Sequence, residues 1–299
     1  MATQSTTEKR NERSEQLDRL SAREIIDLMN EEDQKVPLAV QKALPQIELA
    51  IEAIVDKLSS GGRLFYIGAG TSGRLGVLDA AECPPTFGTD KDLVTALIAG
   101  GSKAVFEAVE DAEDNQEAGK NEVSSHLQAK DVLVGLAASG KTPYVLGAIE
   151  EARRKGIVTI GISCNRHTPL SDVVDYAIEV DVGPEIVTGS TRLKAASAQK
   201  MVLNMISTAT MIRMGKVYKN LMVNVQASNH KLRERVVGII QEAVGVDEET
   251  ARMYSDLAKG DTSAAILMLQ FQIDYPTAMK ELQKSNGHFG KARIQLMTP

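Results

Sequence analysis

The segment Ile67-Gly-Ala-Gly-Thr-Ser-Gly-Arg74 continues directly from the apolar run Leu64–Ile67, which has the length and composition of a buried strand. Glycine and hydroxyl residues end that run, and a helical pattern of apolar residues begins just after them. In a strand–loop–helix arrangement, backbone N–H groups and the positive end of the helix can hold an anion. The segment therefore predicts a strand followed by a helix, with a candidate phosphate-binding loop between them.

A second segment repeats this arrangement. Val134-Gly-Leu-Ala-Ala-Ser-Gly-Lys141 follows the apolar run Val132–Leu136 and aligns with the first segment without gaps. Taken alone, one such loop is most simply a tight strand–helix turn that uses glycine and serine for backbone reasons. Two matching loops in one sheet favour phosphate or sugar binding. The matched pairs are Gly68 with Gly135, Ser72 with Ser139, Gly73 with Gly140, and Arg74 with Lys141.

Strand-like and helix-like patterns alternate on both sides of these loops. Leu93–Ala99 and Ile157–Ile162 are further candidate buried strands, and Tyr176–Val182 is a candidate edge strand. Alternating strands and helices predict right-handed crossovers and an α/β fold with a doubly wound parallel sheet. The helices expected between the strands span about 72–83, 102–118 and 143–155.

The flanking regions read as helical. One helix is expected from Val36 to Ser59, ended by Gly61-Gly62, and one long, mostly buried helix over 190–214. Residues 1–20 carry few apolar side chains and are expected to be mobile. Short helices are expected near 228–244, 248–258, 262–273 and 275–284, with Asp247 and Asp261 as caps. The predicted division is an N-terminal segment and helix at 1–47, an α/β domain at 48–215, and a helical C-terminal subdomain at 216–299.

Composition excludes several classes of protein. The 299 residues include 34 Lys and Arg against 40 Asp and Glu, a net charge of −6 that argues against a nucleic-acid partner. No uncharged apolar stretch reaches the length of a membrane helix, and the polar N-terminus lacks the apolar part of a signal peptide. The two cysteines suit a reducing cytoplasm. The four histidines show no metal-ligand spacing, so no metal site is expected.

Each loop also matches a nucleotide-binding pattern. Gly68–Gly73 satisfies G-x-G-x-x-G, but Leu93–Ala99, the strand that follows, ends in glycines rather than in the acidic residue that would hold a ribose. Gly135–Thr142 satisfies G-x-x-x-x-G-K-[ST], the nucleotide P-loop. Against that interpretation, Pro143 follows at once and Asp181 is a poor candidate for a Mg²⁺ ligand. An ATP-dependent enzyme remains an alternative.

Two carboxylates continue apolar stripes of predicted helices. Glu82 continues the apolar stripe of the helix expected over 72–83. Cys83-Pro84-Pro85 is expected to end that helix. Glu113 occupies a position in the helix expected over 102–118 where the stripe predicts an apolar residue. Most such glutamates simply face solvent at a frayed helix end. If partly buried, they would have raised pKa values and could serve as general acid and base.

Long segments of the chain resemble one family. Ile67–Gly88, which contains Ala-Glu-Cys-Pro-Pro, closely resembles the bacterial N-acetylmuramic acid 6-phosphate etherases, and Gly183–Lys200 resembles both them and glucokinase regulatory protein. Asn30–Val40 and Gly215–Met222 fit as well. The resemblance covers nearly the whole chain apart from its first residues.

The resemblance implies a sugar-isomerase-type (SIS) phosphosugar domain, a homodimer, a sugar-phosphate substrate and no cofactor. It implies an etherase that removes D-lactate from N-acetylmuramate 6-phosphate by elimination and rehydration, with Glu82 and Glu113 as catalytic residues. A binding-only regulator, like the glucokinase regulatory protein, remains an alternative. The residues expected to bind the phosphate or the sugar are Thr71, Ser72, Gly73, Ser139, Gly140, Thr142, Ser190 and Thr191.

Overall fold

The computed structural model describes residues 5–225 and 230–297, which form two compact units. The first comprises Met1–Ala81 and Asp92–Ser207, and the second comprises Glu82–Lys91 and Thr208–Pro299. One boundary falls inside helix α4 (Gly70–Phe87) and another inside helix α8 (Lys194–Arg213).

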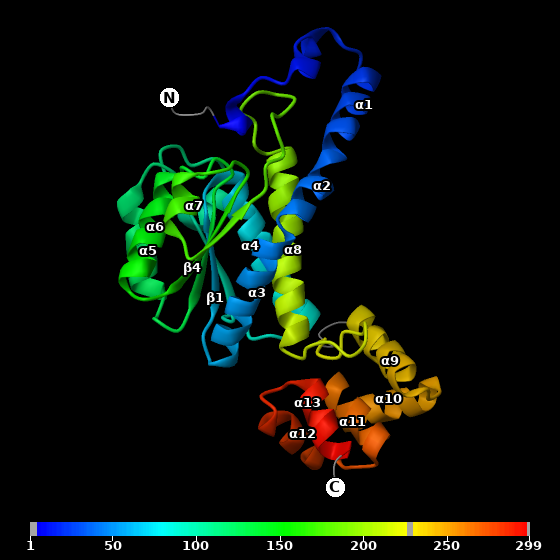
Figure 1. The fold of residues 1–299 in the computed structure, drawn as a ribbon. Coiled ribbons are helices and arrows are strands. Elements are labelled where there is room, and N and C mark those ends of the chain that lie inside the picture. Colours follow the sequence, from blue (N-terminus) through cyan, green and yellow to red (C-terminus); the bar gives the residue numbers. More distant parts are fainter. Residues whose placement is uncertain (1–4, 226–229, 298–299) are drawn as a thin grey trace. The chain divides into compact units, whose positions relative to one another are not determined.

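The first unit is built on a parallel sheet that lies between layers of helices (Figure 1). Its strands lie in the order β2-β1-β3-β4-β5. This order and the helices on both faces confirm the predicted doubly wound α/β fold, and β5 lies at the edge as expected. The strands are β1 (Leu64–Gly68), β2 (Val94–Ile98), β3 (Val132–Leu136), β4 (Val158–Ser163) and β5 (Tyr176–Glu179).

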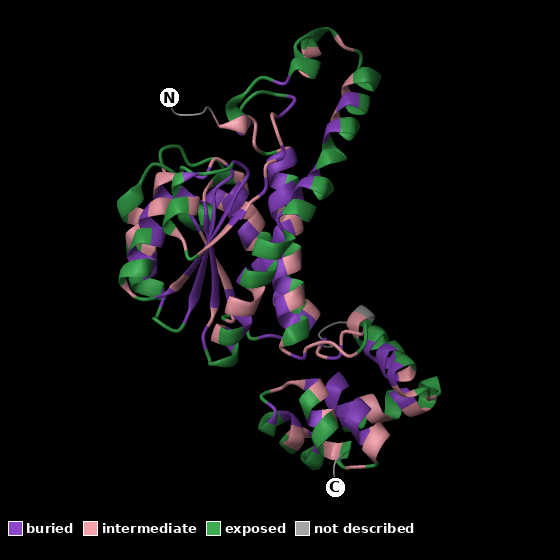
Figure 2. Ribbon diagram, viewed as in Figure 1, coloured by how far each residue is buried: buried purple, intermediate pink, exposed green. Residues whose placement is uncertain are grey.

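Helices cover both faces of this sheet, and the three central strands, β1, β3 and β4, are almost wholly buried (Figures 1 and 2). Side chains alternate along a strand, so neighbouring residues face opposite layers. Phe65 and Leu133 pack in one core with α5 (Gln116–His126) and α6 (Pro143–Arg154). Tyr66 faces the other layer, where its hydroxyl donates to Asp79 of α4 at 3.0 Å.

Helices α5 and α6 pack unusually closely. A Cβ added to Gly119 of α5 would lie 1.9 Å from the carbonyl oxygen of Tyr144, and one added to Gly147 of α6 would lie 2.2 Å from that of Gln116. Only glycine allows these backbones to approach so far. The pair matters for function because the loop before α5 borders the cavity described below.

Two of the helices expected between the strands are wrong in extent. The helix expected over 102–118 is a 3-10 turn at Gly101–Val105, an irregular loop, and then α5. Arg74 explains the interruption, because its guanidinium takes the carbonyls of Ala104, Val105 and Glu107 as hydrogen-bond acceptors. Two of these carbonyls lie in the 3-10 turn and the third just after it, where a continuous helix would need them.

The other correction concerns α4, which runs through Pro84 and Pro85 to Phe87 instead of ending there. The fixed φ of proline is compatible with a helix, so the two prolines remove backbone donors without forcing a turn. The amide of Gly88 donates to the Pro84 carbonyl at 2.9 Å and closes the last turn.

The N-terminal region is more ordered than expected. Residues 5–20 form short 3-10 turns, and Thr7 is fully buried, so the expectation of mobility is wrong for this part. Helix α1 (Ala22–Asp33) follows, begun by a capping box between Ser21 and Glu24. The single helix expected over 36–59 is two helices, α2 (Lys35–Lys42) and α3 (Leu44–Ser59), because Pro45 cannot donate to the Gln41 carbonyl.

The second unit is helical in its described residues. The four short helices expected there are confirmed within the described residues, outside which residues 228 and 229 of the first expected helix lie. Asp247 and Asp261 cap α10 and α11 by accepting from Thr250 N and Ala264 N. A fifth helix, α13, had not been expected. The helices are α9 (His230–Val244), α10 (Glu248–Leu257), α11 (Thr262–Phe271), α12 (Tyr275–Lys284) and α13 (Phe289–Met297). Across the described residues, none of the helices combines the length and apolar character that spanning a membrane requires.

Candidate functional site

The two glycine- and serine-containing loops lie next to each other because β1 and β3 are adjacent strands. Gly68, the last residue of β1, is in register with Leu136, the last residue of β3. The chain leaves β1 towards β2 on one side, whereas β3, β4 and β5 lie on the other. This reversal marks the place where open α/β sheets bind ligands.

A cavity of about 330 Å³ lies at this point. Polar groups from both loops border it, together with residues from three other segments of the first unit. Six residues expected from the sequence are among those that line it: Thr71, Ser72, Glu113, Ser139, Thr142 and Thr191. The other lining residues are Glu8, Ala69, Gly70, Asp114, Ala138, Lys141, Pro143 and Gly189.

Three other predicted binding residues do not line this cavity. Gly73 lies against the β1 backbone, where a Cβ would be 2.7 Å from the Gly68 carbonyl oxygen. Gly140 has φ +70° and would place a Cβ 2.3 Å from the side chain of Thr168. Ser190 lies in the neighbouring loop, where its amide donates to the Val187 carbonyl. These two glycines shape the loops through close packing.

The two cations aligned in the sequence have different environments. Lys141 is exposed and lines the cavity, while its backbone amide donates to Ser139 Oγ at 3.2 Å. Arg74 does not line it, and its guanidinium is committed to the three carbonyls of the loop over 104–107. Lys141 is therefore the cation of this pair that is available to an anion in the cavity.

Glu113 reaches the cavity from the irregular loop before α5. Its carbonyl oxygen accepts from Tyr144 N of α6 at 2.9 Å, which anchors the loop beside the second phosphate-loop candidate. Glu113 also lines an adjoining cavity of about 220 Å³, which shares Ala69 and Gly70 with the first. Its side chain is exposed, so the condition of partial burial, under which its pKa would rise, is not met, and Glu113 faces solvent as most such glutamates do.

Glu82 is likewise exposed, as expected of a glutamate that faces solvent near a helix end. It lies on α4 just beyond the boundary at Ala81 and belongs to the second unit. On the same helix, the buried carboxylate is Asp79, which accepts from Tyr66 and pairs with Lys200 of α8 at 3.2 Å.

Sequence patterns missed three residues at the cavity or directly behind it. Asp114 follows Glu113, and Glu8 reaches the cavity from the N-terminal region. Gln199 of α8 lies behind the lining, where its Oε1 accepts from Ser72 Oγ at 2.8 Å. No local periodicity marks Glu8 or Gln199, because their neighbours in space are more than a hundred residues away in the chain.

The family-like segment Gly183–Lys200 has a clear structural role. The Glu185 carboxylate accepts from Lys194 N at 3.1 Å and Ala195 N at 2.9 Å, at the start of α8. Burial raises the pKa of Glu185, and these two amides oppose the rise. The Lys194 ammonium, buried as well, bonds Glu32 of α1 at 2.7 Å. This segment therefore joins α8 to the N-terminal helices.

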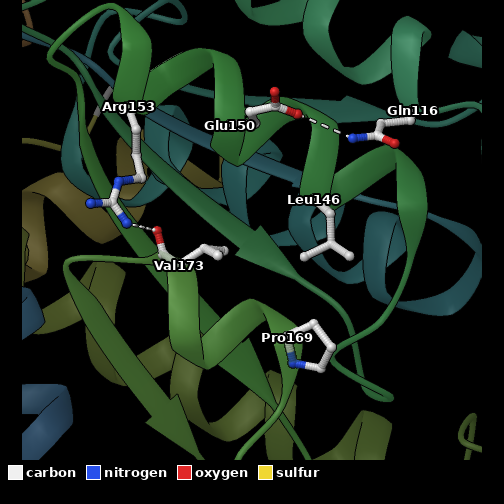
Figure 3. Close-up of a pocket in the computed structure, with 6 residues that line it drawn as sticks. All are labelled: Gln116, Leu146, Glu150, Arg153, Pro169 and Val173. Carbon is white, nitrogen blue, oxygen red and sulfur yellow. Dashed lines mark hydrogen bonds between the residues drawn. The ribbon is translucent and has the colours of Figure 1, made fainter.

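A larger groove, about 430 Å³, lies elsewhere on the first unit (Figure 3). Its apolar lining comes from Leu146, Pro169 and Val173. Its polar groups are already paired, since Gln116 donates to Glu150 at 3.1 Å and Arg153 donates to the Val173 carbonyl. With no hydroxyl side chain in its lining, it is a poorer candidate for a sugar phosphate than the cavity at the strand ends.

Comparison with known proteins agrees with this fold. Residues 46–153 match the glucokinase regulatory protein N-terminal SIS domain family, and residues 105–209 match the SIS domain family. A phosphoheptose isomerase structure from Neisseria gonorrhoeae shares the fold, with a TM-score of 0.50 and 15% identity over 64% of this chain and 99% of that one.

Curated relatives extend the likeness to nearly the full chain. The N-acetylmuramic acid 6-phosphate etherase of Geobacillus sp. is 54% identical over 96% of this chain and 98% of its own length. The enzyme of the same name from Exiguobacterium sp. is 52% identical over 96% and 98%. At this identity and coverage, the chain belongs to the N-acetylmuramic acid 6-phosphate etherase family.

Proposed function

We propose that this protein cleaves the D-lactyl ether of N-acetylmuramate 6-phosphate, giving N-acetylglucosamine 6-phosphate and D-lactate. The observation that carries the proposal is the cavity at the ends of β1 and β3, where hydroxyls from two loops meet a carboxylate, in a chain of this family. This arrangement of hydroxyls and a carboxylate supports binding of a sugar phosphate beside an acid–base group.

Elimination followed by hydration avoids direct hydrolysis of an ether, whose alkoxide is a poor leaving group. In the open-chain sugar, the C2 proton is acidic because it lies next to the C1 aldehyde. A base removes that proton, lactate leaves C3 as it gains a proton, and an α,β-unsaturated aldehyde forms. Water then adds at C3, and the proton returns to C2.

We assign proton removal at C2 to Glu113, and protonation of lactate and activation of water to Glu82. General acid–base catalysis by a placed carboxyl contributes about 10²–10⁴ in rate. The exposure of both glutamates is consistent with groups that must reach a substrate. The Ala-Glu-Cys-Pro-Pro resemblance supports the assignment of Glu82. The resemblance at Glu113-Asp114 and the place of Glu113 in the cavity lining support the assignment of Glu113.

Ser72, Ser139 and Thr142 are proposed to hold the phosphate, with Thr71, Ser190 and Thr191 as further contacts and with help from the backbones of Gly73 and Gly140. Fixing the phosphate positions C2 and C3 against the catalytic groups, which is how remote binding contributes to rate. Lys141, exposed beside these hydroxyls, supplies a positive charge in a chain whose net charge is −6.

Labelled water provides the test. In H₂¹⁸O, turnover of N-acetylmuramate 6-phosphate is expected to place ¹⁸O at C3 of N-acetylglucosamine 6-phosphate and none in lactate. Label in lactate would mean that the lactate C–O bond breaks and would contradict the elimination. Absence of turnover by the folded protein would favour the alternative of a binding-only regulator.

The finer assignments are part of the same proposal. We propose a cytoplasmic homodimer, with residues 48–215 as the catalytic phosphosugar domain and 216–299 as a helical subdomain.

The contacts of Asp181 weigh against the ATP-dependent alternative. Its carboxylate accepts from Thr6 and from Gly183 N, and Asp181 does not line the cavity. Thermal stabilisation by Mg·ATP would revive that alternative.

A further inference from the structure

The N-terminal segment forms part of the wall of the cavity. Thr7 N donates to Asn165 Oδ1 at 3.1 Å, and Asn165 Nδ2 donates back to Thr7 Oγ1 at 3.0 Å. The same Nδ2 lies 3.1 Å from the carbonyl oxygen of Ala138, which lines the cavity. Both Thr7 and Asn165 are buried, so this amide ties the segment to the loop after β3.

The segment is also held on the side of the loop over 183–191. Thr6 Oγ1 donates to Asp181 Oδ1 at 3.0 Å, and Asn11 Nδ2 donates to the Pro184 carbonyl at 3.3 Å. Gly189 of that loop lines the cavity, and a Cβ added there would lie 3.6 Å from Glu8 Oε2. Glu8 is thus placed in the lining by anchors on both sides of it in the chain.

A carboxylate at this place has a definite chemical preference. It repels a phosphate, but it accepts hydrogen bonds from sugar hydroxyls and from an amide N–H. The donors suited to a phosphate are Ser72, Ser139, Thr142 and Lys141 of the two strand-end loops. Glu8 reaches the cavity from a segment other than these two loops. Because its carboxylate repels a phosphate and accepts from hydroxyls, it suits the sugar part of the ligand.

We propose that the Glu8 carboxylate binds the sugar part of the sugar phosphate and so selects sugar phosphates over inorganic phosphate. This inference rests on the proposed function for the identity of the cavity's ligand. It extends the site to a region of the chain in which the sequence suggested no structure, and it makes the residue a specificity determinant rather than a proton-transfer group.

Calorimetric titration of the full chain with N-acetylglucosamine 6-phosphate and, separately, with inorganic phosphate tests the inference. Glu8→Ala is expected to weaken sugar-phosphate binding about tenfold, as loss of a hydrogen bond to a charged group predicts. Inorganic phosphate should bind as well as before or more tightly, because a negative charge has been removed. Glu12→Ala, an exposed change in the same segment, should alter neither affinity.

Unchanged sugar-phosphate affinity in Glu8→Ala would overturn the inference, and so would an equal loss for both ligands, which is the result expected of a structural role. Should Glu8→Ala fail to fold, Glu8→Gln preserves the shape of the side chain and is expected to show a smaller loss in the same direction. Turnover of N-acetylmuramate 6-phosphate by the wild type is measured independently. If it is absent while binding depends on Glu8, the etherase proposal fails and this inference stands; if the wild type binds no sugar phosphate, both fail.

Discussion

Ser72 Oγ donates a hydrogen bond of 2.8 Å to Gln199 Oε1, and both residues are buried. Ser72 lines the cavity, whereas Gln199 lies behind it on α8. Within the described residues, Gln199 Nε2 has no hydrogen-bond partner. A buried donor without an acceptor costs about 1–3 kcal/mol. Turning the amide by half a rotation would let Nε2 donate to Ser72 Oγ and release the Ser72 proton towards a bound phosphate.

The first prediction follows from this amide. Gln199→Glu replaces the amide with a carboxylate, which can only accept hydrogen bonds. The Ser72 hydroxyl then keeps donating to residue 199 instead of to the phosphate, and a negative charge is added near the phosphate. Binding of N-acetylglucosamine 6-phosphate should weaken about tenfold or more at mildly alkaline pH, measured by calorimetry. Gln199→Met is the matched control, since it leaves the hydroxyl free and should bind nearly as well as the wild type. Equal affinities in the two variants would contradict the predicted role.

Glu113 is predicted to be essential for turnover. Glu113→Gln keeps the shape of the side chain and leaves the carbonyl that accepts from Tyr144 N, so the loop should remain in place. The steady-state rate should fall about 10²–10⁴-fold, with an unchanged thermal unfolding midpoint. Glu107→Gln in the same loop, outside both cavity linings, should retain activity. A near-normal rate in Glu113→Gln would exclude Glu113 as the base.

Glu82 is predicted to be equally necessary. Because its side chain is exposed, Glu82→Ala should fold normally and bind N-acetylglucosamine 6-phosphate, while turnover is abolished. A circular dichroism spectrum and a binding isotherm establish folding and binding before the rate is measured. Retention of activity would remove Glu82 from the mechanism.

The ion pair between Glu32 and Lys194 should govern part of the acid stability. Burial tends to raise the pKa of Glu32, but hydrogen bonds from Lys194 and Lys35 outweigh it and lower the pKa to about 2. A folded-state pKa below the usual value of about 4.3 means that the stabilisation is fully present above that pH and is lost as pH falls towards 2.

Glu32→Ala tests this network. It leaves the buried Lys194 ammonium without its carboxylate and should lower the free energy of unfolding by about 3–5 kcal/mol at neutral pH. Denaturant titrations over a pH series should also show a weaker loss of stability below about pH 4.3 than in the wild type. Glu31→Ala, an exposed neighbour, should change stability little. A loss no larger than that of Glu31→Ala would argue against the buried pair as a stabilising element.

Close packing of α5 and α6 yields the last prediction. Gly119→Ala places a methyl group against the Tyr144 carbonyl, so the helices must separate and the loop that carries Glu113 must shift. We expect a loss of about 1–3 kcal/mol in stability together with lower activity. Gly238→Ala in α9, where no atom lies within 4 Å of the added Cβ, should instead stabilise by about 0.5–1 kcal/mol. Thermal unfolding of both variants measures whether each substitution lowers or raises stability. Unchanged stability and activity in Gly119→Ala would contradict the packing argument.

By itself, the sequence determined the features that arise from neighbouring residues. Buried strands, the glycine–serine loops after β1 and β3, and the aspartate caps of α10 and α11 all follow from side-chain period and turn chemistry within a few positions. The two phosphate-loop candidates could therefore be named before the fold was known, whereas the helical stripe that singled out Glu113 belongs to a helix that does not form. Proline predicted helix ends less reliably than these features. A helix ends just before Pro45, but α4 continues through Pro84.

Only the tertiary structure decided which of these features meet. Adjacency of β1 and β3 brings the loops together, and nothing local specifies which parallel strands become neighbours. The helix expected around Glu113 does not form, because Arg74, about thirty positions earlier in the chain, occupies the carbonyls near the expected start of that helix. Glu8 and Gln199 join the cavity or its support through partners far along the chain, and such contacts leave no periodic trace in sequence.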